Sequence, residues 1–63
     1  MARAQLQRAL SNRVLIEQAK GVVALTHTVD MEEAFAILRQ YARDNGQRLV
    51  EVAEQVVNRT LDL

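Results

Sequence analysis

Residues 30–46, DMEEAFAILRQYARDNG, decide the fold, because they contain the start, one apolar face and the end of a single helix. Asp30 and Glu33 have the spacing of a capping box: the Asp30 carboxylate accepts from an early backbone N–H, and Glu33 reaches back to the N–H of Asp30. Behind them, apolar side chains recur at the i, i+3, i+4, i+7 spacing of one helix face. These are Met31, Ala34, Phe35, Leu38, Tyr41 and Ala42. We expect this face to lie in the core.

The same stretch ends in a turn, and another helix follows it. Asn45 and Gly46 tolerate the left-handed backbone that ends many helices, so the helix is expected from Met31 to about Arg43. After the turn the apolar period returns. The side chains are Leu49, Val52, Ala53, Val56 and Val57. The sequence therefore predicts a further amphipathic helix over residues 48–60.

A longer helix is predicted upstream, from Ala2 to Leu25, because its residues are mostly strong helix formers and the chain has no proline. Thr26 to Val29 lacks helical periodicity and is expected to be a loop. The upstream helix has two apolar faces. One contains Leu6, Leu10, Val14 and Leu25, and the other contains Ala9, Ile16, Ala19 and Val23. Two faces imply two neighbours, so we expect one face in the domain core and a second copy on the other, with Leu6, Leu10 and Val14 at the dimer interface.

Length and composition restrict the class of protein. With 63 residues there is room for one domain, over 1–63, and a chain this short buries only about 60% of its unfolded surface, which favours a partner. Cysteine is absent and His27 is the single histidine, so no metal or cofactor is predicted. No apolar run reaches the length of a membrane span, and the amino terminus does not resemble a signal peptide. We expect an all-α, three-helix bundle in the cytoplasm, whose long first helix extends into a coiled coil or dimer interface.

Basic side chains are concentrated at the start of the chain, although the net charge is zero. Arg13, Glu17 and Lys20 share one strip of the first helix, which is typical either of a salt-bridged solvent face or of a phosphate contact. Gly21 is costly inside a helix, which implies either the close approach of another backbone, protein or nucleic acid, or a local bend. Close packing of another helix is the favoured explanation.

A second basic group brackets the turn at residues 45–46. Arg39 and Arg43 lie one turn apart, and Arg48 begins the last helix. Guanidinium groups bind phosphates, and an exposed Tyr41 ring could stack on an unpaired base. Tyr41 also fits the core face, so both readings stay open.

Other classes of function are less well supported. The serine and threonine residues lack a histidine–carboxylate arrangement, so we do not expect an enzyme. The two helices over residues 31–60 also permit a DNA-binding helix-turn-helix, but Glu51 and Glu54 would then oppose the phosphates. A helical dimerisation module without a nucleic-acid role is the remaining alternative.

Several spaced motifs together resemble the ANTAR domain over about residues 9–57. They are ALSNR at 9–13, IEQAKG at 16–21, EAF at 33–35, LR at 38–39, AR at 42–43 and LVEVA at 49–53. The resemblance implies an RNA-binding output domain of bacterial antitermination regulators, usually carried behind a receiver or GAF sensor that this chain does not contain. Such domains are expected to bind tandem stem-loops with hexanucleotide loops as dimers, so that the overlapping terminator hairpin cannot form.

The resemblance also implies which residues contact RNA. Lys20 and Gly21 match the family's Ala-Lys-Gly segment, and Arg13 matches its first-helix arginine. Its basic positions in and after the second helix correspond to Arg39, Arg43 and Arg48, with Tyr41 as a possible stacking residue. One departure is Gly46, which stands where many members have asparagine.

Overall fold

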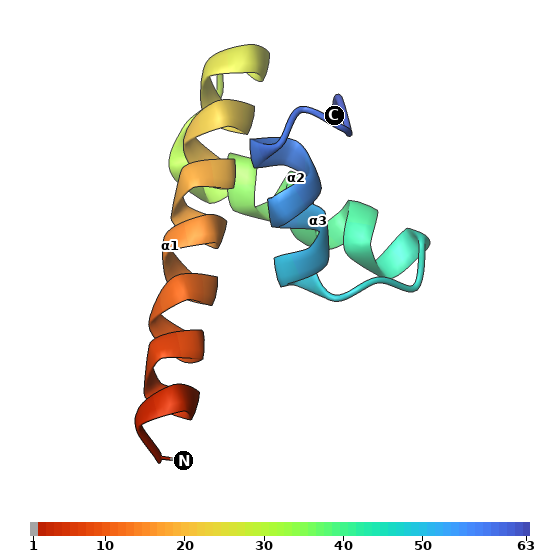
Figure 1. Ribbon diagram of the computed structural model, residues 1–63. Coiled ribbons are helices and arrows are strands. Elements are labelled where there is room, and N and C mark those ends of the chain that lie inside the picture. Colours follow the sequence, from red (N-terminus) through yellow and green to blue (C-terminus); the bar gives the residue numbers. More distant parts are fainter. Residues whose placement is uncertain (1) are drawn as a thin grey trace.

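A computed structural model describes the backbone of residues 2–63 and the side chains of residues 10–63. It contains α1 (Ala2–His27), α2 (Met31–Asp44) and α3 (Leu49–Val57), and no strand in this part of the chain. Helix α2 crosses behind the C-terminal half of α1 and α3 lies beside it, while the N-terminal half of α1 extends past both (Figure 1). The predicted all-α, three-helix bundle is confirmed.

The core is formed where the three helices meet, and it is thin. Leu38, Val23 and Val52 are the largest fully buried side chains. Among residues 10–63, the buried side chains are Ala19, Val23, Ala34, Leu38, Ala42, Val52, Ala53 and Val56. Half of these are alanines, which bring the helices close together but bury little area. A core of this kind stabilises the domain only modestly.

Only one of the two apolar faces of α1 packs inside the domain. Ala19 and Val23 lie in the core, whereas Leu10, Val14 and Leu25 are 55%, 54% and 84% exposed. The division of α1 into two faces therefore holds, and the outward face has no neighbour among the described residues. The side chain of Leu6 lies outside the described part. Dimerisation and the coiled-coil extension stay predictions.

The start of α2 agrees with the sequence in one respect and differs in two. Asp30 Oδ1 accepts from the Glu33 backbone N–H at 2.8 Å, so the N-cap is as predicted. Only this half of the predicted capping box forms among the described hydrogen bonds. Met31 was expected in the core but is 41% exposed. It lies in the first turn, at the end of the apolar face, where neither neighbouring helix covers it.

All three helices end in the same way. In each, a backbone N–H donates to the carbonyl five residues earlier, which is the Schellman arrangement, and the residue before that N–H is left-handed. The donors and acceptors are Val29 to Ala24 (3.0 Å), Gln47 to Ala42 (2.9 Å) and Thr60 to Gln55 (3.0 Å). The left-handed residues are Thr28 (φ 55), Gly46 (φ 60) and Arg59 (φ 63).

These ends correct two predicted boundaries. Helix α1 ends at His27, two residues beyond Leu25, because the left-handed residue is Thr28. Helix α3 ends at Val57 and not at Thr60, because Arg59 reverses the chain. Helix α2 ends at Asp44, one residue from the expected position, where Gly46 marks the turn.

The left-handed residues predict two opposite changes in stability. Thr28→Gly removes the conflict between a β-branched side chain and a positive φ, and should raise the free energy of unfolding by about 1 kcal/mol. Gly46→Ala introduces the same kind of conflict and should lower it by about 1 kcal/mol. Urea denaturation followed by circular dichroism measures both. Changes of the same sign in the two variants would contradict the explanation.

The last residues fold back onto the bundle instead of continuing α3. Leu61 and Leu63 pack against the core, and His27 Nε2 donates to the carbonyl oxygen of Leu63 at 2.7 Å. The tail thereby ties the end of α1 to the rest of the domain. Within the described part of the chain, no helix is both long enough and apolar enough to cross a membrane.

Candidate nucleic-acid interface

Two cations from different helices meet on one aromatic ring. Lys20 Nζ of α1 lies 5.1 Å from the centre of the Phe35 ring, and Arg39 Cζ of α2 lies 5.2 Å from it. Phe35 is half-buried and lines a shallow hollow at the surface. Both distances are within the range of a cation–π attraction. We call Lys20, Phe35 and Arg39 the Phe35 cluster.

Lys20 also has an acidic neighbour on its own helix. Its Nζ lies 3.1 Å from Glu17 Oε2, in an i, i+3 ion pair. The Lys20 side chain is 19% exposed and that of Glu17 is 55% exposed. An ion pair with so exposed a partner contributes little to stability. Lys20 is therefore held in place by packing on Phe35, and an incoming phosphate would compete with Glu17 for its charge.

The arginines of α2 lie on one flank of the helix, and Tyr41 lies on another. Arg43 follows Arg39 by four residues, which turns it only about 40° around the helix. Tyr41 follows Arg39 by two residues, or about 200°. Of the two interpretations left open for Tyr41, its packing against the core favours the core residue. Arg43 continues the surface of the Phe35 cluster, and Tyr41 does not.

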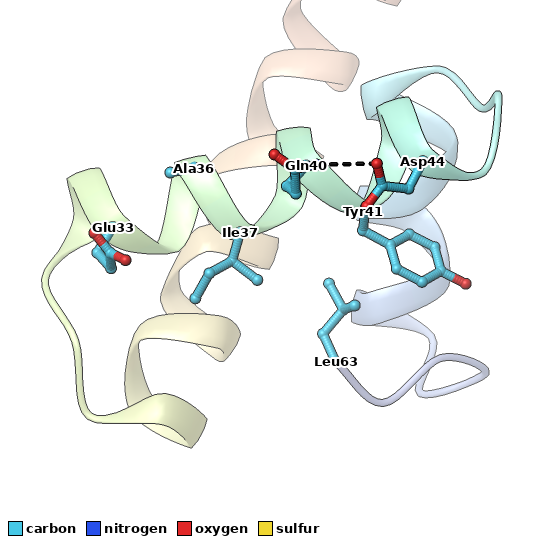
Figure 2. Close-up of a pocket in the computed structure, with 7 residues that line it drawn as sticks. All are labelled: Glu33, Ala36, Ile37, Gln40, Tyr41, Asp44 and Leu63. Carbon is cyan, nitrogen blue, oxygen red and sulfur yellow. Dashed lines mark hydrogen bonds between the residues drawn. The ribbon is translucent and has the colours of Figure 1, made fainter.

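Tyr41 lines a shallow groove on its own flank of α2, together with Ile37 and Leu63 (Figure 2). It is half-buried and packs against the core. The polar residues around this groove are Glu33, Gln40 and Asp44, with Gln40 Nε2 donating to Asp44 Oδ1 at 2.9 Å. Acidic side chains around this groove do not favour the binding of phosphate.

The other two predicted arginines, Arg13 and Arg48, lie away from the Phe35 ring. Arg13 is exposed on α1, two turns before Lys20 and on the same strip. Arg48 is exposed at the N-cap of α3, where its backbone N–H donates to Glu51 Oε1 at 2.9 Å. Arg13 therefore extends the strip of Lys20 along α1, whereas Arg48 belongs to another helix.

Gly21 does not have the packing that was expected for it. A Cβ built on Gly21 would meet nothing within 4 Å, so no helix of the described chain approaches it closely. The reason is its position: α2 and α3 cover the face of α1 that contains Ala19 and Val23, whereas Gly21 faces outward. The close helix packing predicted at Gly21 is wrong within this chain.

Acidic side chains border the Phe35 cluster on one side. A shallow hollow beside the ring is lined by Asp30, Glu32, Glu33, Phe35, Ala36 and Arg39. These carboxylates lie at or next to the first turn of α2, where they stabilise the helix N-terminus. Within the described residues, no three histidine or carboxylate side chains gather to hold a metal. An anion would approach the ring from the side of Arg39 and Arg43.

The sequence interpretation missed Phe35 as a surface residue, because it counted the ring only as part of the core face. One local signal was available: Arg39 follows Phe35 by four residues, and side chains at this spacing touch on a helix. The approach of Lys20 had no such signal, since it depends on how α1 packs against α2.

Two comparisons with known proteins bear on this surface. The sequence model of the ANTAR domain matches residues 4–57. The chain is also 41% identical, over 54 residues, to the nitrate regulatory protein of Klebsiella oxytoca. The matched part is 86% of this chain and 14% of that protein, so the chain spans a small part of its relative's length. No solved structure matches the chain.

Proposed function

The chain belongs to the ANTAR domain family, as the motifs of its sequence predicted, and we propose that it is the RNA-binding domain of a transcription antitermination regulator. The observation that carries the proposal is the Phe35 cluster, in which cations from two helices lie against a partly exposed ring. Cations bind the phosphates of RNA, and planar groups stack on unpaired loop bases. The Phe35 cluster combines both properties.

We assign the contacts to one continuous surface. Lys20, Arg39 and Arg43 bind phosphates around the loop, and Arg13 reaches the stem along the strip of α1. The Arg39 guanidinium, supported from behind by Phe35, offers its free face to a loop base. Tyr41 is left out of this surface because it lies on the acidic flank of α2.

The RNA is proposed to be a tandem pair of stem-loops with hexanucleotide loops in a nascent message. A dimer of the chain holds both hairpins, so that the overlapping terminator hairpin cannot form and transcription continues. The mechanism is binding alone, with no catalytic step and no cofactor. We place the domain in the bacterial cytoplasm, behind a receiver or GAF sensor in a longer protein.

The charge of the chain predicts modest affinity for one hairpin. Its net charge is zero, and the acidic first turn of α2 lies beside the site. Counterion release from about four phosphates gives a slope of log K against log salt of about −3 to −4. Simultaneous binding of two hairpins by a dimer would raise the effective affinity without new contacts.

A titration at stated salt concentration tests the proposal. The chain is mixed with a tandem hexaloop RNA, with the same RNA carrying scrambled loops, and with duplex DNA of equal length. We expect the hexaloop RNA to bind about tenfold more tightly than either control, which corresponds to about 1.4 kcal/mol. Equal binding of all three nucleic acids would mean that the surface binds by general electrostatic attraction and does not recognise the loops.

The same titration decides against the main alternative. In a helix-turn-helix protein, α3 would enter the major groove of DNA, yet it exposes Glu51 and Glu54 there. Tighter binding to duplex DNA than to the hexaloop RNA would support that alternative and overturn the RNA proposal.

A further inference from the structure

We infer that a second copy of this chain packs antiparallel on the outward face of α1, with the two-fold axis passing between Glu17 and Gln18. The face consists of Leu10, Val14, Gly21 and Leu25, which we call the outward stripe. This inference deepens the dimer of the proposed function. Its test contains no RNA, so it can fail while RNA binding stands, and the reverse.

The outward stripe is exposed and consists of two parts, Leu10 with Val14 and Gly21 with Leu25, which lie on either side of Glu17 and Gln18. Its residues follow each other at intervals of four, seven and four positions, which keeps them on one side of a helix. Among the side chains of residues 10–63, the exposed large apolar ones are Leu10, Val14, Leu25 and Met31, and the first three lie on this stripe. The domain's own core uses the opposite side of α1, around Ala19 and Val23.

The spacing of the stripe is self-complementary under a two-fold axis. When two copies of α1 run antiparallel about the point between Glu17 and Gln18, Leu10 faces Leu25 of the second copy. Val14 then faces Gly21 of the second copy. A two-fold interface requires this reciprocity, since each contact occurs twice. The position facing the branched Val14 side chain is a glycine with open space where a Cβ would be.

Charge also favours the antiparallel arrangement over the parallel one. In a parallel pair, Glu17 would face Glu17 of the second copy, and like charges across an interface repel. In that parallel pair, Gly21 would also face Gly21 of the second copy, and no side chain would fill the space between the two helices there. In the antiparallel pair, Glu17 faces Gln18 of the second copy, whose amide can donate to the carboxylate.

The arrangement has a consequence for the Phe35 clusters. Lys20 lies on a flank of α1, about 100° around the helix from Gly21. A two-fold axis perpendicular to α1 keeps the corresponding flanks of both copies on the same face of the dimer. The two clusters would thus lie side by side on one surface, as two adjacent hairpins require. A parallel dimer would turn them to opposite faces.

Cysteine cross-linking tests the register, because the natural chain has no cysteine. The variant combines Val14→Cys with Gly21→Cys. Within one helix these positions are about 10 Å apart, too far for a disulfide, so any cross-link joins two chains. We expect the double variant to give a covalent dimer, in about tenfold greater yield than either single variant. In a single variant the two equivalent cysteines of the dimer are also about 10 Å apart along the helix axes, too far for a disulfide.

Each outcome of the cross-linking experiment either supports or overturns the antiparallel register. Cross-linking of the double variant alone supports the antiparallel register. Efficient cross-linking of Val14→Cys by itself indicates a parallel pair, because position 14 then faces itself, and overturns the inference. Failure of the double variant to cross-link also overturns it.

A measurement without cysteine gives an independent check. Leu25→Glu should weaken dimerisation about tenfold or more in sedimentation equilibrium, because it places a charge in the apolar seam. Met31→Glu is the matched control, since Met31 is also an exposed apolar residue but lies outside the stripe. Equal effects of the two substitutions, or no effect of Leu25→Glu, would contradict the assigned surface.

Discussion

Leu38→Ala should lower the free energy of unfolding by about 2–5 kcal/mol, the largest change expected from a single substitution in this domain. Leu38 is completely buried and is the largest side chain of the core. Much of the core around it is alanine, so it has few large side chains that could move into the cavity. Because a domain of this size is stable by only about 3–9 kcal/mol, a large fraction of the variant should be unfolded on mild heating.

Urea and thermal denaturation followed by circular dichroism measure this effect. Leu25→Ala is the matched control, since the same side chain is removed at a position that is 84% exposed. At a concentration where the chain is monomeric, the control should change stability by less than about 0.5 kcal/mol. Similar losses in the two variants would show that the core is not centred on Leu38.

The helices and the core were predictable because both follow from local periodicity. The apolar face of α2 selects Ala34, Leu38 and Ala42, and these are the residues that are buried. The same period in α3 selects Val52, Ala53 and Val56. Met31 was predicted wrongly, because periodicity gives the direction of a side chain but not whether a neighbouring helix reaches it.

The helix ends were predictable only where the chain uses glycine. Gly46 is left-handed at the end of α2, and that end was placed within one residue. Thr28 and Arg59 adopt the same conformation with side chains that disfavour it, so the ends of α1 and α3 were misplaced. For the same reason residues 58–60 were taken as part of the last helix, although Arg59 reverses the chain there and leads into the tail that brings Leu63 to His27.

The candidate site was predictable in its charges but not in its arrangement. Lys20 and Arg39 were selected as cations, yet their meeting on Phe35 depends on the packing of α1 against α2. Nearness in sequence also does not place side chains on one flank, since Tyr41 lies about 200° around the helix from Arg39. Contacts between helices, rather than the composition of one helix, determine the surface.

Lys20→Gln combined with Arg39→Gln should weaken binding of the tandem hexaloop RNA about 100-fold, because each cation contributes about 1–2 kcal/mol through charge-assisted contacts. Glutamine keeps a polar side chain at the half-buried position 20 and at the exposed position 39, so the helical content measured by circular dichroism should not change. The slope of log K against log salt should also become less steep by about 1 for each lost phosphate contact.

Arg59→Gln is the matched control for the loss of positive charge. Arg59 lies beside Val22 and Leu61, on the other flank of α1 from Lys20. If only the total charge mattered, each of the three substitutions would weaken binding equally. We expect Arg59→Gln to weaken it less than about threefold, since a remote charge contributes only through the screened field of the domain.

Phe35→Leu then separates the ring from the charges that it holds. Leucine retains an apolar side chain of similar burial and leaves Lys20 and Arg39 in the chain, but it removes the cation–π contacts. We expect binding to weaken about threefold to tenfold, from the loss of about 1 kcal/mol of positioning energy, and Phe35→Tyr to bind nearly as well as the natural chain. Binding that is unchanged by Phe35→Leu would mean that the cations act independently of the ring. If Phe35→Tyr also loses binding, the RNA contacts the edge of the ring and not its face, because tyrosine differs from phenylalanine only at that edge.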